Sequence, residues 1–146
     1  MKLFKLILLC LFLFSNAYAN TIYELIKIPH LEIYNIKTEN KLRYLYAKQP
    51  FTIGADNNIN CFNSTEQDLK KKYTIIEKNL NRYTKDFHKK INLKYIVLCE
   101  DLSISGIGTA GIPDNVMKTL ILDIKFNEKY FERVLHHEVF LSLIHI

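Results

Sequence analysis

Two short apolar runs and the helix that follows them constrain the fold more than any other feature. "LKYIVLCEDL" at 93–102 and "KTLILDI" at 118–124 are separated by a glycine-rich connection, "SISGIGTAGIPDN". Runs of this length and composition are typical of buried strands. A helix should then begin near Asn127, a suitable N-cap residue that has Glu128 in the first turn. We therefore expect an α+β fold.

A second helix of about five turns is predicted from near Thr65 to Tyr83. Ser64 and Gln67 resemble a capping box, and apolar residues then recur at steps of three and four positions. Residues 22–54 contain many β formers interrupted by prolines, which indicates short strands or irregular extended segments. The sequence shows no repeat or linker, so we expect one domain after the N-terminal segment.

The N-terminal segment has the organisation of a secretory signal peptide. Lys2 and Lys5 precede an apolar run at 6–14, and Ala17-Tyr18-Ala19 follows as a small-residue cleavage site. The apolar run is well short of the ~20 residues that a bilayer-spanning helix needs. We predict a signal peptide at 1–19, cleavage after Ala19, a secreted or periplasmic protein, and no stable membrane anchor after cleavage.

The charge pattern argues against a nucleic-acid partner. The formal net charge of +5 includes Lys2 and Lys5, so removal of the signal peptide lowers it to +3. The densest lysine run, at 68–90, also contains acidic residues, which is typical of a solvated helix face. We therefore expect no nucleic-acid binding.

Two cysteines, Cys61 and Cys99, remain after signal cleavage. An even number of cysteines in an exported protein favours a disulfide. However, Cys99 lies inside an apolar run and could equally be a buried thiol. The sequence leaves both interpretations open.

The last helix contains "VLHHEVF", in which ionisable side chains interrupt an apolar segment. Burying such groups without partners is costly, so they need a role. His137 and Glu138 match the first two residues of an H-E-x-x-H motif, while position 141 is Leu. His136 lies on a different face of the helix and is interpreted as a hydrogen-bonded packing residue.

The stretch from about Leu93 to Phe140 resembles the core of the zincins, the H-E-x-x-H zinc metallopeptidases. In that family a twisted sheet lies over the active-site helix, and an edge strand borders the cleft that binds peptide substrates in extended form. The resemblance implies a small twisted sheet packed on helices, in which residues 93–99 and 119–124 are neighbouring strands and the helix from about 128 lies beneath them. It further implies that "GTAGIPDN" and "KTLILDI" supply the cleft wall, that His137 is a zinc ligand, and that Glu138 is the general base acting on metal-bound water. It also implies a Zn²⁺ cofactor and a peptide or protein substrate.

The last six residues, "LSLIHI", correspond to the translation of CTG TCT CTT ATA CAC ATC. That string is the end sequence of a transposon adapter used in preparing DNA for sequencing. On this hypothesis residues 141–146 are not native, and residues 20–140 are an incomplete metallopeptidase domain whose missing ligands follow Phe140, beginning with a histidine. The alternative is a genuine apolar helix end that contains His145.

Two functional hypotheses follow. The first is an exported zinc-dependent metallopeptidase, represented by an N-terminal fragment that is inactive by itself because one histidine cannot hold the ion in catalytic geometry. The second is a small exported binding or interaction protein without metal or enzymatic activity, in which the histidines are packing residues.

Overall fold

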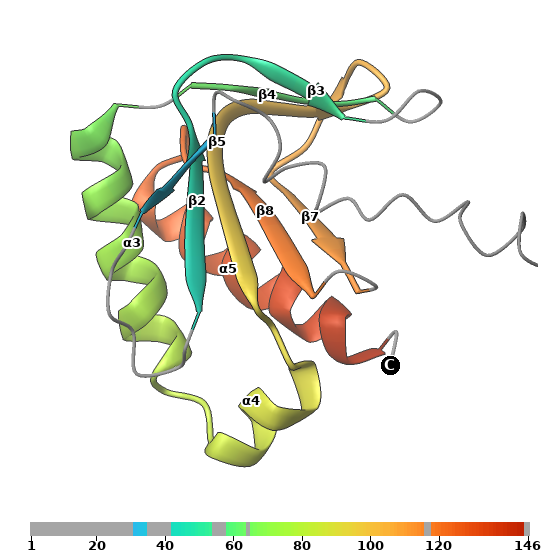
Figure 1. Cartoon of the computed structure of the whole chain (residues 1–146). Coiled ribbons are helices and arrows are strands. Elements are labelled where there is room, and N and C mark those ends of the chain that lie inside the picture. Colours follow the sequence, from blue (N-terminus) through green and yellow to red (C-terminus); the bar gives the residue numbers. More distant parts are fainter. Residues whose placement is uncertain (1–30, 35–41, 54–57, 64, 116–117, 145–146) are drawn as a thin grey trace, which may run out of the picture.

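The computed structural model describes residues 31–34, 42–53, 58–63, 65–115 and 118–144 (Figure 1). The predicted signal peptide at 1–19 and its cleavage site after Ala19 lie outside these ranges. The elements follow one another in this order: β1 (Leu31–Tyr34), β2 (Arg43–Ala47), β3 (Phe51–Ile53), β4 (Ile59–Phe62), α3 (Glu66–Leu80), α4 (Lys85–Ile91), β5 (Tyr95–Ile104), β6 (Ile107–Gly108), β7 (Gly111–Asp114), β8 (Thr119–Asp123) and α5 (Glu128–Ile144). The predicted α+β class is confirmed.

The strands form a mixed sheet centred on β5. Strands β2, β5 and β8 are parallel to one another, while β1 and β7 are antiparallel to their neighbours β2 and β8. Val97 of β5 is paired with Ile121 of β8, so the prediction that these two runs are neighbouring strands is confirmed. The second half of β5 turns away to pair with β4 and β6, and β4 pairs with β3.

The sheet is covered on both faces. On one face, Ile96 and Leu98 of β5 pack into a cluster with apolar residues of α3 and α5. On the opposite face, Val97 and Cys99 pack with residues of β3 and β4, which cross the end of the sheet at the top of Figure 1. Alternate side chains of β5 therefore enter two different cores, which explains why residues 95–99 are apolar without a break.

The helix ends are set by local capping interactions. Asn127 caps α5, since its Oδ1 accepts a hydrogen bond from Tyr130 N at 3.0 Å, as predicted. Thr65 caps α3 by accepting from Asp68 N at 3.3 Å, and Ser64, predicted as the cap, lies outside the described residues. Among the helices in the described ranges, none has the length and apolar character needed to cross a bilayer.

The predicted helix from 65 to 83 was wrong at its C-terminal end. Helix α3 stops at Leu80, and the separate helix α4 begins after Thr84, whose Oγ1 accepts from Phe87 N at 3.2 Å. Asn92 then ends α4 in the left-handed conformation, with φ 46°. The Thr84 side chain caps the first turn of a new helix, so the helix is interrupted there. The apolar periodicity continues across the interruption and gave no sign of it.

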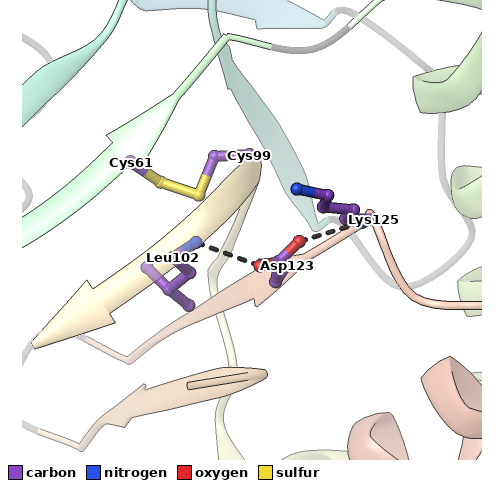
Figure 2. Close-up of a disulfide and its surroundings, with 5 residues drawn as sticks. All are labelled: Cys61, Cys99, Leu102, Asp123 and Lys125. Carbon is purple, nitrogen blue, oxygen red and sulfur yellow. Dashed lines mark hydrogen bonds between the residues drawn. A yellow bond between two sulfur atoms is a disulfide. The ribbon is translucent and has the colours of Figure 1, made fainter. Parts of the chain in front are cut away.

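A disulfide joins the two parts of the sheet. Cys61 of β4 is bonded to Cys99 of β5, with 5.6 Å between their Cα atoms (Figure 2). Both residues are fully buried. Of the two interpretations that the sequence left open, the structure contains the disulfide.

Candidate active site

Glu138 is buried where α5 passes beneath the edge strand β7. Only 8% of the surface of Glu138 is exposed to solvent. A Cβ atom built on Gly111 of β7 would lie 2.6 Å from Glu138 Cγ and 3.2 Å from its Oε1. The missing side chain at Gly111 therefore makes the space that the glutamate occupies.

The carboxyl group of Glu138 is incompletely satisfied. Its Oε2 atom is buried and accepts no hydrogen bond from any described residue. Burial raises the pKa of Glu138, and the neighbouring His137 lowers it by a smaller amount. Buried polar atoms normally have partners, so an unpartnered carboxylate oxygen with a raised pKa is a candidate for a chemical role.

His137 lies next to Glu138 in the sequence but points to a different environment. It is exposed, whereas Glu138 is buried. At 100° per residue, His137 shares one side of α5 with Tyr130, Val134 and Leu141. Position 141, where the motif would place a second histidine, carries a half-buried leucine.

The described residues fit a zinc ion only in part. Within the described ranges, no group of three or more His, Cys, Asp or Glu side chains lies close enough together to hold a metal. A catalytic zinc needs three protein ligands, and His137 would provide one. The described part of the chain is therefore insufficient as a metal site by itself.

His136 is a packing residue, as the sequence predicted. Its Nδ1 atom is hydrogen-bonded to the hydroxyl group of Tyr83, and its Nε2 lies 3.2 Å from Asn79 Oδ1. These partners assign the proton to Nε2, which donates to the amide oxygen of Asn79. Asn79 in turn donates to Glu132 Oε1 at 3.1 Å. The network joins α5 to α3 and leaves His136 with both ring nitrogens satisfied.

Strand β7 forms one wall beside this region. Residues Gly111–Asp114 pair with β8 in antiparallel register, Gly111 opposite Leu122 and Asp114 opposite Thr119. Among the described strands, β7 pairs only with β8, so it forms an edge of the sheet. The sequence predicted a glycine-rich connection at 103–115, and the resemblance assigned the cleft wall to 108–115 and 118–124. The structure instead forms β6 and β7 within 103–115 and places β7 against α5.

A hollow of about 670 Å³ lies at the N-terminal end of α5. It is bounded by the end of β5, the β5–β6 turn, Thr109 and Ala110 before β7, and Phe126 and Tyr130. No sequence pattern indicated this hollow. The walls of the hollow come from residues far apart in the chain, so no single stretch of sequence predicts it. The glycine-rich connection was the one local pattern that pointed to this part of the fold.

Asp123, at the C-terminal end of β8, supports the wall of this hollow. Its two carboxylate oxygens accept hydrogen bonds from Leu102 N at 3.0 Å and Lys125 N at 2.9 Å, as Figure 2 shows. Burial nevertheless raises the pKa of Asp123, and the two backbone hydrogen bonds oppose this shift. Asp123 thus fixes the turn into α5 and is already satisfied by the backbone.

No protein-family model, no curated protein and no solved structure matches this chain.

Proposed function

We propose that this chain is the N-terminal part of an exported zinc-dependent metallopeptidase. The observation that carries the proposal is the position of Glu138. A carboxylate with one unpartnered buried oxygen lies beneath an edge strand and follows an exposed histidine on the same helix. The adjacent His137 and Glu138 match the first two positions of H-E-x-x-H, a motif in which the glutamate is not a ligand.

The chain's own contribution to the reaction would be proton transfer and substrate placement. Glu138 would accept a proton from the attacking water and return it to the leaving amine, and a pKa above that of an ordinary glutamate suits this role. The edge of β7 would bind an extended peptide through its backbone groups. A zinc ion held by His137 and by two ligands outside the described residues would supply Lewis-acid chemistry.

The test uses the native gene, recovered beyond the codon for Phe140 and expressed to its natural end. We expect one tightly bound zinc per chain and hydrolysis of unfolded polypeptide that chelators abolish. Glu138→Gln should keep the zinc and lose most of the turnover, because the water loses its base. Glu128→Gln is the matched control, since Glu128 is exposed and paired with Lys71 at 2.7 Å; it should keep both.

Two results would contradict the proposal in different ways. An extended protein that binds no zinc would favour the second hypothesis, a small exported binding protein without metal. Full activity of the Glu138→Gln protein would support a peptidase but show that Glu138 is not its general base. Zinc content and peptide hydrolysis should therefore be measured on the same preparations.

A further inference from the structure

The hollow at the start of α5 combines an aromatic wall with a charged rim. Phe126 and Tyr130 form the wall, with ring centroids 4.8 Å apart, and they are 37% and 44% exposed. Ser103 and Thr109, which carry hydroxyl groups, also line the hollow. A volume of about 670 Å³ is within the range of small-ligand sites. The hollow therefore offers partly exposed aromatic rings and polar groups to one ligand.

The charged rim is an ion pair that is easily exchanged. Lys125 Nζ lies 2.6 Å from Asp101 Oδ1, and both side chains are more than half exposed. Exposed ion pairs of this kind contribute little to stability, so a better partner can displace the lysine from Asp101. The lining also contains Asp123, so carboxylates outnumber cations there. The adjoining Glu100 has a raised pKa because of burial and the charges of Asp68, Asp101 and Asp123.

We propose that this hollow binds an arginine side chain of an extended peptide. A guanidinium group stacks on aromatic rings and bonds a carboxylate through two parallel N–H groups. Tyr130 and Phe126 provide the rings, and Asp101 provides the carboxylate once Lys125 moves into solvent. Lysine offers a point charge without the planar face, so arginine is the preferred side chain.

The location gives the arginine a place in the substrate, and this step rests on the proposed function. Tyr130 and His137 lie on the same side of α5, seven residues apart, a rise of about 10.5 Å. An extended peptide advances about 3.3 Å per residue. The arginine should therefore lie about three residues from the scissile bond.

Binding can be measured on the full chain without metal. The probe is an acetylated and amidated peptide with one arginine among serine and alanine residues, titrated by calorimetry. The matched peptide carries citrulline, which keeps the shape and removes the charge. We expect binding of the arginine peptide and at least tenfold weaker binding of the citrulline peptide.

Two variants should change this binding in opposite directions. Asp101→Asn removes the carboxylate and should weaken binding at least tenfold; Asp101 has φ 49°, a conformation that asparagine also tolerates. Lys125→Gln removes the competing cation and should strengthen binding. Lys129→Gln, a matched change at an exposed lysine outside the hollow, should leave binding unchanged.

The outcomes separate this inference from the proposed function. Equal binding of the two peptides, or unchanged binding by both Asp101→Asn and Lys125→Gln, would reject the arginine site whatever the peptidase assay shows. Selective arginine binding together with an extended protein that holds no zinc would support the site and reject the peptidase. In an active extended protein, a peptide library should show arginine selected about three residues from the cleavage point.

Discussion

At the scale of single residues, Glu138 should make the stability of the chain depend on pH. Burial raises the pKa of Glu138, so the folded chain binds this proton more tightly than the unfolded chain does. The stabilising contribution is complete below the ordinary value of 4.5 and is lost as the pH rises through the raised pKa. Above that raised pKa, an ionised carboxylate with an unpartnered oxygen is buried in the folded chain.

Glu138→Gln should therefore match the wild type at about pH 4 and be more stable by about 1 kcal/mol near pH 8, the scale of one poorly satisfied buried group. Urea unfolding at several pH values measures the difference. Glu128→Gln is the control, in which the difference in stability from the wild type should change with pH in the opposite direction, because Lys71 lowers the pKa of Glu128. If Glu138→Gln were instead less stable near pH 8, the native carboxylate would have a stabilising partner.

The position of His137 and Glu138 in the last helix was predictable from the sequence, but the residues that surround Glu138 were not. Apolar neighbours in "VLHHEVF" indicated a helix with an embedded polar group. Gly111, which makes space for Glu138, lies 27 positions earlier and reaches it only through the register of β7 on β8. Such a contact depends on tertiary pairing, which local pattern does not encode.

At the scale of elements, the packing of β7 on α5 should depend on the absence of a side chain at Gly111. Gly111→Ala would place its methyl group 2.6 Å from Glu138 Cγ, so one of the two elements must move. We expect a loss of about 1–3 kcal/mol in the free energy of unfolding, the usual cost of overpacking. Denaturant titration of the single variant measures this loss.

The control is a neighbouring glycine with free space around it. A Cβ on Gly108 would meet no heavy atom within 4 Å, so Gly108→Ala should change stability by less than about 0.5 kcal/mol. The contact itself is isolated by a double-mutant cycle with Glu138→Ala, in which Gly111→Ala should cost less. An equal cost in both backgrounds would assign the loss to the backbone of β7.

The elements that sequence predicted well were those with a strong local signal. Strands β5 and β8 each contain a continuous apolar run, and α5 begins at a clear N-cap residue. Strand β7 was missed because it lies in a stretch that was interpreted as a glycine-rich connection. Its Pro113 is tolerated because β7 is an edge strand, where fewer backbone donors are needed for the ladder. Strand β4 carries too short a pattern to be distinguished from a loop.

At the scale of the whole molecule, β5 connects two packed layers. Its first half lies between β2 and β8, and its second half pairs with β4. The change of direction coincides with Asp101, whose φ is 49°, and with a register shift between Asn60 and Phe62 of β4. The hollow that we assign to arginine lies at this bend, so its shape depends on how β4 and β5 are held together.

The Cys61–Cys99 disulfide should supply much of that constraint. The bond closes a sequence separation of 38 residues, which corresponds to about 4 kcal/mol of lost conformational entropy in the unfolded chain. Replacing both cysteines by alanine should lower the free energy of unfolding by about that amount, measured by urea titration against the oxidised wild type. The unfolded and reduced wild type should refold to a stability close to that of the double variant, which separates loss of the cross-link from loss of two buried sulfur atoms. If the protein, once unfolded, reacted with a thiol reagent at both cysteines, the bond would be absent, and the bend in β5 would have to be held by packing alone.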